Sequence, residues 1–384
     1  MKHSFFLRAA LLPFMPNSIA NPFRPPPGHT SSCHPRSGEA GAVFALTNAA
    51  DDNQVVAFSR DDAGKLTQTG IYSTGGQGQG VDFDTQGGLQ LSDDNRFLYA
   101  VSPADDKVSV FAVQGSCLTR IQDIYGGDQP LSITLNNGLA YVLDGSVATT
   151  GIRGFRVQSN GQLEPIGNST IPLSTLIGVP GTVLFNPDGK NLIVTNKVGS
   201  TIDFFEVDGD GKAQGPVTTT ASSGNRPFGA FFRGDGVLFV VESGLPILTN
   251  AAVSTYDVGS TGALSAITKS EKNQQTDGCW IVVPSSGKFA YTANFASGTI
   301  SSYSAATDGT VALIDGIAAN QGNGSEPVDL ALSRDSKFMY NLLRGFGAIS
   351  GHQIQDDGSL KSVGVFGQGQ GLPPDNGASG LAAY

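Results

Sequence analysis

The sequence predicts an all-β fold, a seven-bladed β-propeller with four strands in each blade, and three observations support it. The chain has 51 Gly and 20 Pro in 384 residues and only 15% charged residues, which is typical of many short strands joined by turns. Runs of alternating apolar residues are separated by Asp, Asn and Gly. A unit made of these runs occurs seven times, about every 49 residues, as four-stranded blades do.

The second and third strands of the repeat are the easiest to recognise. The second strands contain apolar and aromatic residues, at Ala42–Ala45, Arg96–Tyr99, Gly138–Tyr141, Lys190–Ile193, Gly236–Phe239, Lys288–Tyr291 and Lys337–Tyr340. The third strands follow at Val55–Phe58, Val108–Phe111, Ile152–Phe155, Ile202–Phe205, Val253–Tyr256, Ile300–Tyr303 and Ala348–Gly351. Asp-Gly pairs such as Asp308-Gly309 then predict tight hairpin turns, because Gly tolerates a positive φ.

The two ends of the predicted propeller are expected to share one blade. The first predicted strand, near Val43, has the pattern of a second strand, whereas residues 378–384 are similar to the innermost strands at Leu89–Ser92 and Leu330–Ser333. We expect the C-terminal strand to complete the first blade, because an open ring would leave two exposed sheet edges. A β-sandwich array or a parallel β-helix would need turns at shorter spacing. The predicted propeller domain is therefore 41–384.

The first forty residues predict export. An apolar run from Phe5 to Met15 follows Lys2 and precedes the small residues Ser18-Ile19-Ala20, so residues 1–20 are interpreted as a signal peptide. The alternative is an amphipathic N-terminal segment, because Arg8 interrupts the run. Residues 21–40 contain five prolines and are predicted to be a disordered linker.

Export has two consequences that the sequence also predicts. We expect the protein to be secreted and extracellular, either free or attached to a cell wall. The sequons at Asn168 and Asn323 would then be available for glycosylation.

Composition and motifs exclude several classes of partner. The net charge of −10 and the lack of a basic run argue against binding to nucleic acid or to anionic membranes. No segment has the length or hydropathy of a membrane-spanning helix. The three cysteines have no metal-ligand spacing, and no nucleotide-binding motif is present; Gly76–Gly80 and Gly367–Gly371 are interpreted as flexible blade connections. We therefore expect no metal, no cofactor and a monomeric protein.

The chain resembles the seven-bladed lactonase-type propellers, which include 6-phosphogluconolactonases and the fungal 3-carboxymuconate cyclases. The resemblance covers residues 41–384 and is carried by Asn186–Lys190, Asn225–Gly229, Cys279–Val283, Glu326–Ser333 and Ser379–Ala383. In active members it implies a His, an Arg and a Glu at the channel mouth. The Arg matches Arg226 and the Glu matches Glu242, so these two are the predicted catalytic residues. The family's His is missing, because Val179-Pro180-Gly181 stands at its position.

Propeller geometry predicts which other residues gather at the channel mouth. Turns between second and third strands share one face with the connections between blades. The predicted substrate-binding residues on that face are Lys197, Arg344, Asp144, Asp277, Asn294 and Trp280. Such a mixture of charges suits an anionic or polyhydroxylated ligand. The alternative for the polar residues is that they are solvated turn residues, and Trp280 is either part of the core or a stacking platform.

Two functions remain open from the sequence. In the first, the protein opens or forms a lactone ring on a small carboxylate-bearing substrate without a metal: Arg226 and Lys197 bind the carboxylate, and Glu242 moves the proton. In the second, the protein is a non-catalytic secreted or wall-associated propeller that binds a small carboxylate or lactone, or interacts with a partner. The missing His favours the second hypothesis, whereas a Glu base would allow the first.

Overall fold

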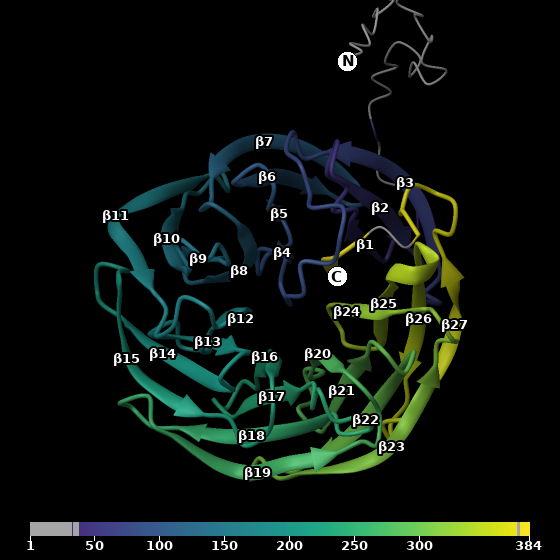
Figure 1. Cartoon of the computed structure of the whole chain (residues 1–384). Coiled ribbons are helices and arrows are strands. Elements are labelled where there is room, and N and C mark those ends of the chain that lie inside the picture. Colours follow the sequence, from purple (N-terminus) through teal and green to yellow (C-terminus); the bar gives the residue numbers. More distant parts are fainter. Residues whose placement is uncertain (1–32, 34–37, 375–376) are drawn as a thin grey trace, which may run out of the picture. The chain divides into compact units, whose positions relative to one another are not determined.

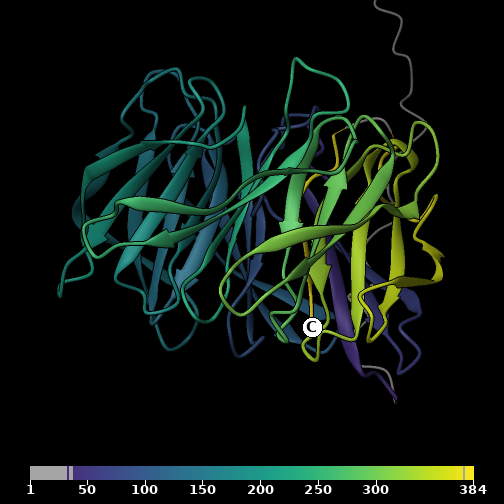
Figure 2. The same cartoon turned by 90° about the horizontal axis from the view of Figure 1, so that it is seen from below.

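The computed structural model describes Cys33, residues 38–374 and residues 377–384. The predicted signal peptide and most of the predicted linker lie outside these residues. The described propeller consists of seven four-stranded antiparallel sheets, as the sequence predicts. Figure 1 shows the sheets as blades around a central axis, and in Figure 2 their strands run between the two faces.

The innermost strand of each blade lines the central channel. These strands are β28 (Leu381–Ala383), β4 (Leu89–Leu91), β8 (Pro130–Asn136), β12 (Pro180–Phe185), β16 (Pro227–Phe232), β20 (Gly278–Val282) and β24 (Pro327–Leu332). The second strands are β1 (Gly41–Leu46), β5 (Phe97–Ser102), β9 (Leu139–Asp144), β13 (Asn191–Asn196), β17 (Leu238–Glu242), β21 (Phe289–Asn294) and β25 (Phe338–Leu343).

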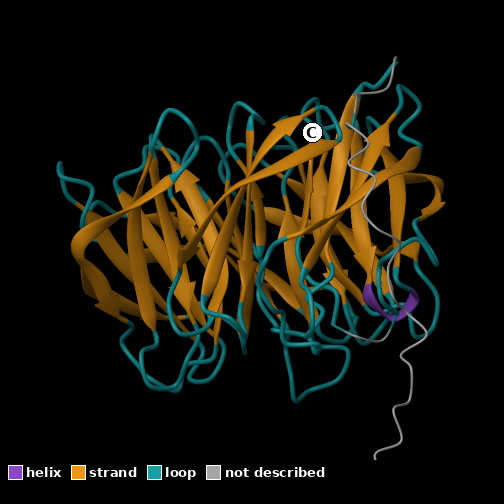
Figure 3. Cartoon of the chain, turned by 90° about the horizontal axis from the view of Figure 1, so that it is seen from above, coloured by secondary structure: helices purple, strands orange, loops and turns teal. Residues whose placement is uncertain are grey.

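The two outer strands of each blade complete the sheets. The third strands are β2 (Gln54–Arg60), β6 (Lys107–Gln114), β10 (Gly151–Val157), β14 (Thr201–Val207), β18 (Ala252–Val258), β22 (Thr299–Ala305) and β26 (Ala348–Ile354). The fourth strands are β3 (Leu66–Ser73), β7 (Cys117–Tyr125), β11 (Leu163–Pro172), β15 (Ala213–Ala221), β19 (Leu264–Lys272), β23 (Val311–Asn320) and β27 (Leu360–Phe366). The helical segment in Figure 3 is the 3₁₀ turn η1 (Arg344–Phe346). Within the described part of the chain, no helix has the length and hydropathy to cross a membrane.

The C-terminal strand closes the ring as predicted. Strand β28 pairs with β1 over Val43–Ala45, so the first blade combines both ends of the propeller. Beside it, the Arg60 side chain donates hydrogen bonds to the backbone carbonyls of Ala40 and Tyr384. The closure therefore covers the edge of β1 that would otherwise be unpaired.

Buried tyrosines on the second strands connect neighbouring blades. The hydroxyl of Tyr99 donates to the carbonyl of Gly161, which lies in the outer hairpin turn of the next blade, at 2.9 Å. Tyr141, Tyr291 and Tyr340 make the equivalent bond to Gly211, Gly358 and Gly64. The Tyr340 bond crosses the closure between the last blade and the first. The aromatic residue and the turn glycine that recur in the sequence are thus the two halves of one contact between blades.

Candidate functional site at the channel mouth

The face that carries the blade connections and the turns between second and third strands is called here the mouth face. Its most prominent element is the connection from β3 to β4, of which residues 77–88 are called the 77–88 loop. At its end Gln86 contacts four innermost strands of four different blades. Its backbone N–H donates to Gly181 and its carbonyl accepts from Ser132, while its side chain donates to the carbonyl of Ala230 and accepts from the N–H of Ile281. Gln86 therefore reaches into the channel and links four of its seven innermost strands.

The start of this connection is ordered rather than flexible. Within Gly76–Gly80, the N–H groups of Gly78 and Gly80 donate to the carbonyls of Ala49 and Asn48, at 2.8 Å each. Asn48 is fully buried and donates to the carbonyls of Val81 and Gly377. The interpretation of this segment as a flexible connection is therefore corrected. The repeated Gly and Gln residues pointed to flexibility, but contacts from distant residues fix the backbone.

Two of the three predicted basic site residues, Lys197 and Arg344, form ion pairs with acids of the 77–88 loop. The ammonium group of Lys197, whose side chain is fully buried, lies 2.6 Å from the Asp84 carboxylate and 4.4 Å from the centre of the Phe228 ring. The Arg344 guanidinium lies 2.6 Å from Glu326 and 3.3 Å from Asp82. Asp82 and Asp84 were not among the predicted site residues. Because they belong to a connection with no strand pattern, only the tertiary structure shows which cations they meet.

Four consecutive blades place an equivalent residue at the mouth. Val179, Arg226, Asp277 and Glu326 each directly precede an innermost strand, and their φ angles are 48°, 56°, 62° and 48°. A positive φ is uncommon outside Gly and is least favourable for a β-branched residue such as Val. Backbone strain of this kind concentrates at functional sites. The family resemblance already pointed to Arg226 and to the stretch Val179-Pro180-Gly181, but the shared backbone position only becomes visible in the structure.

Arg226 and Asp277 form the accessible polar pair of this set. Both side chains are half-buried. Among the described residues Arg226 has no ion-pair partner; its Nε donates to the Ser243 hydroxyl at 3.3 Å. Burial raises the pKa of Asp277, the Cys279 thiol 3.3 Å away lowers it, and the charge of Asp84 raises it further, whereas Arg226 and Lys197 lower it. A cation without an ion-pair partner among the described residues thus acts electrostatically on a carboxyl group whose pKa is raised by burial.

Glu242, a predicted catalytic residue, lies at the mouth-side end of its blade, where it pairs with Pro227, but its side chain is turned away from the mouth. It ends β17, is fully buried, and accepts hydrogen bonds from Ser222, Gly224, Ser254 and Ser270 at 2.6–3.1 Å. Both oxygens are therefore occupied within the blade, and the residue holds the 222–224 turn against β18 and β19. Its placement on the solvated rim is corrected, because the register of β17 points the side chain into the sheet packing.

Three predicted binding residues are also parts of the framework. Asn294 is fully buried and bonds to Asn273, Thr299 and Ser301. Asp144 is 6% exposed and accepts from the N–H groups of Asp128 and Ser146. Trp280 is 1% exposed, packs on Phe228 at 5.0 Å and donates to the carbonyl of Thr85. Trp280 therefore supports the 77–88 loop from below, and a ligand cannot stack on it.

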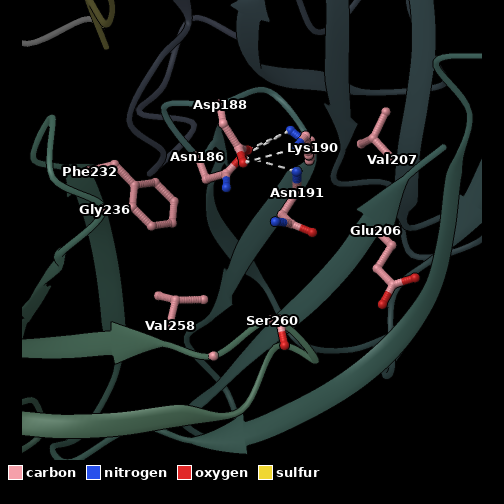
Figure 4. A pocket seen from close by; sticks show the side chains of 11 residues that line it. Asn186, Asp188, Lys190, Asn191, Glu206, Val207, Phe232, Gly236, Val258 and Ser260 are labelled. Atoms are coloured by element: carbon pink, nitrogen blue, oxygen red, sulfur yellow. Dashed lines mark hydrogen bonds and ion pairs between the residues drawn. The ribbon is translucent and has the colours of Figure 1, made fainter. Parts of the chain in front are cut away.

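The two larger cavities away from the mouth face do not include the predicted basic site residues. One of about 520 Å³ lies between neighbouring blades on the opposite face, and Figure 4 shows Asn186, Asp188, Lys190 and Asn191 along one side of it. These polar groups bond mainly within their own turn, where Asn186 accepts from the N–H groups of Lys190 and Asn191. The second, of about 360 Å³, lies in the channel on the far side of Gln86. Neither contains Arg226, Lys197 or Arg344.

The remaining predictions concern surface chemistry. The glycosylation candidates Asn168 and Asn323 are both exposed. Cys117 is disulfide-bonded, whereas Cys279 is a buried free thiol. Among the described residues, no group of three or more His, Cys, Asp and Glu is arranged to hold a metal ion.

Fold and sequence place the protein in a class and then in a family. The class is that of the seven-bladed β-propellers with four-stranded blades. Within it, the chain belongs to the lactonase, 7-bladed beta-propeller family, whose model matches residues 51–175 and 230–329.

Individual relatives are distant. A protein from Pectobacterium carotovorum named 6-phosphogluconolactonase is 23% identical over 69% of this chain and 79% of its own length. The solved structure of a periplasmic gluconolactonase from Pseudomonas aeruginosa is 13% identical, with a TM-score of 0.67 over 89% of this chain and 98% of that one. A Lactobacillus plantarum structure is similar at 16% identity, with a TM-score of 0.69 over 90% and 99% of the two chains. At such identities these structures support the fold alone.

Proposed function

We propose that the protein hydrolyses a lactone at the mouth of its central channel, with Arg226 and Asp277 as the catalytic residues. The observation that carries this proposal is the pair itself: a cation without an ion-pair partner among the described residues, and a carboxyl group whose pKa is raised mainly by burial and lowered by the charge of that cation. Both residues precede innermost strands of adjacent blades with left-handed backbones. The family membership supports the same reaction.

The geometry assigns a role to each residue. Asp277 accepts a proton from water as the water oxygen attacks the lactone carbonyl carbon, and a raised pKa makes it a better base near neutral pH. Arg226 binds the negative charge that develops on the carbonyl oxygen. The ring C–O bond then breaks, and the proton on Asp277 passes to the leaving alkoxide to give the hydroxy acid. The earlier assignment of the base to Glu242 is replaced, because both Glu242 oxygens are buried and hydrogen-bonded.

The test is a pH-stat assay of acid release from lactones, together with ultraviolet absorbance for muconates to detect the ring-forming direction. Asp277→Asn should lower kcat by about 10²–10⁴-fold, and Arg226→Ala by about 10²–10³-fold. Glu242→Gln should lower the melting temperature instead. Asp188→Asn, on the opposite face, is the matched control. Turnover that survives both mouth variants would contradict the site.

A second function, a non-catalytic binding propeller, is favoured by one observation. Val179-Pro180-Gly181 stands where the resemblance places the family's His, so the mouth lacks that acid–base group at this position. Ligand binding that depends on Arg226 without turnover of any lactone or muconate would support this function.

We also propose that the protein is exported. The disulfide-bonded Cys117 is typical of oxidising compartments, and both sequon asparagines are exposed. Mass spectrometry of the native protein should show a new N terminus near residue 21 and glycans at Asn168 or Asn323. An intracellular protein that retains Met1 would contradict export.

A further inference from the structure

An apolar groove adjoins the catalytic side of the mouth face. It has a volume of about 250 Å³. Its buried floor includes Phe83 of the 77–88 loop and Leu131 of β8, and its walls include Val147, Ile177 and Val179. Ligand pockets combine such apolar surfaces with a few polar groups that orient the ligand. The groove is therefore shaped for a small apolar group.

The walls of the groove expose large apolar side chains to solvent. Val147 is 72% exposed, Ile177 67% and Val179 48%. Exposed apolar side chains that gather around a hollow mark a site of interaction. Val179 also keeps its unfavourable φ of 48°, whereas the equivalent residues of the next three blades are Arg226, Asp277 and Glu326. The mouth is therefore apolar on one side and charged on the other.

The groove is continuous with the charged residues. Asp82 lines the groove and also forms the ion pair with Arg344, and the next two residues of the loop are Phe83 and Asp84. The backbone N–H of Lys197 donates to the carbonyl of Val179 at 3.2 Å, while its ammonium binds Asp84. The charges of Asp84 and Lys197 in turn act on Asp277, so this ion pair lies between the groove and the proposed catalytic residues, and a ligand that spans it would reach both.

The charges at the mouth oppose a phosphorylated ligand. Lys197 and Arg344 are paired with Asp84, Asp82 and Glu326, so these cations are not free to bind a phosphate. Adding Asp277 to these three acids gives the mouth four carboxyl groups. Adding Arg226 to Lys197 and Arg344 gives it three basic groups. A dianionic phosphate would meet net repulsion there, whereas the single charge that develops on a lactone carbonyl needs only Arg226.

We propose that this groove binds the apolar substituent of the substrate, so that the substrates are lactones carrying an alkyl chain or an apolar ring and not phosphorylated sugar lactones. This inference rests on the proposed lactone hydrolysis and specifies its substrate class.

The first experiment compares lactones that differ only in chain length. Initial rates of acid release are measured for γ-butyrolactone, its 4-alkyl derivatives with two to eight carbons in the chain, and 6-phosphogluconolactone. We expect kcat/KM to rise about three- to fourfold for each added methylene until the groove is filled. We expect 6-phosphogluconolactone to be the poorer substrate. If 6-phosphogluconolactone is turned over faster than every alkyl lactone, the inference is wrong while lactone hydrolysis stands.

The second experiment places a charge in the groove. Ile177→Asp should reduce kcat/KM for the longest lactone about tenfold more than for γ-butyrolactone, because the chain then meets a carboxylate. Ile247→Asp is the matched control: Ile247 is 56% exposed on the same face and does not line the groove. An equal loss on short and long lactones in the Ile177 variant would overturn the inference.

If no lactone is hydrolysed, a binding experiment still tests whether the groove holds the apolar chain. Calorimetry with the hydroxy acid of the longest lactone should then show binding that Ile177→Asp weakens; no binding would overturn the inference together with the proposed function.

Light scattering tests whether a second copy of the chain occupies the groove instead. Concentration-dependent association that Ile177→Asp abolishes would mean that the groove binds a second copy of the chain, which also overturns the inference.

Discussion

At the residue scale, acid–base neighbours set the charge state of the mouth. Burial raises the pKa of Asp82 and the charge of Asp84 raises it further, while Arg344 and Lys197 lower it. The fully buried Lys197 side chain pairs with Asp84, which offsets the cost of burying an ammonium group. These pairs could not be predicted from sequence, because the partners are distant along the chain.

Asp329 allows a prediction about pH. It lies buried on β24 and accepts a hydrogen bond from the Gly380 N–H at 2.7 Å, and burial raises its pKa from 3.8 to about 7. Between about pH 4 and pH 7 the folded protein therefore holds a proton that the unfolded chain has released, so the free energy of unfolding falls as pH rises. A shift of this size corresponds to at most about 4 kcal/mol.

Denaturant titrations between pH 4 and pH 8 measure this effect. Asp329→Asn cannot ionise, so the stability of the variant relative to the wild type should increase across that range. The exposed Asp188→Asn serves as the control. Parallel pH profiles for wild type and Asp329→Asn would contradict the assignment.

At the scale of the element, the 77–88 loop decides what the channel can hold. Gln86 bonds to β8, β12, β16 and β20 at once, so this residue ties the loop to four of the seven innermost strands. The loop also supplies Asp82 and Asp84 to the mouth and Phe83 to the groove. One connection between blades thereby forms the floor of the site.

Gln86→Ala tests this role. The substitution leaves the carbonyl of Ala230 and the N–H of Ile281 without their side-chain partner, which should lower the free energy of unfolding by about 1–3 kcal/mol. Amide hydrogen exchange in residues 77–88 should become faster. Gln77→Ala, an exposed position in the same loop, is the control. Unchanged exchange in the Gln86 variant would show that other contacts hold the loop.

At the scale of the whole molecule, stability depends on closing the ring. Strand β28 pairs with Val43–Ala45, and Gly380 bonds to Asp329 of the last blade. The tyrosine contacts repeat between neighbouring blades, including Tyr340 to Gly64 across the closure. Four of the junctions between blades, the closure among them, are thus held by a tyrosine hydrogen bond.

Deletion of residues 378–384 should open this ring. It exposes the edge of β1 and removes the partner of Asp329, so we expect a loss of several kcal/mol and a melting temperature lower by about 10 °C. Differential scanning calorimetry measures the change. Tyr384→Ala, which keeps the backbone of β28, is the control. A melting curve unchanged by the deletion would mean that closure contributes nothing to stability.

The sequence alone determined the architecture of the propeller. Seven repeats with apolar strands, second-strand aromatics and turn glycines define seven blades, because each signal acts within a blade or between sequential blades. The sequence also placed Arg226 and Asp277 at the mouth, because the connections between blades all lie on one face.

Only the tertiary structure decided which of these residues are free. It paired Lys197 and Arg344 with acids of the 77–88 loop, buried Glu242 and Asn294 within their blades, and linked Gln86 to four of the innermost strands. The physical reason is that a connection without strand periodicity is positioned by contacts with blades far away in the sequence. Charge pairing and burial depend on such contacts and leave no periodic signal along the chain.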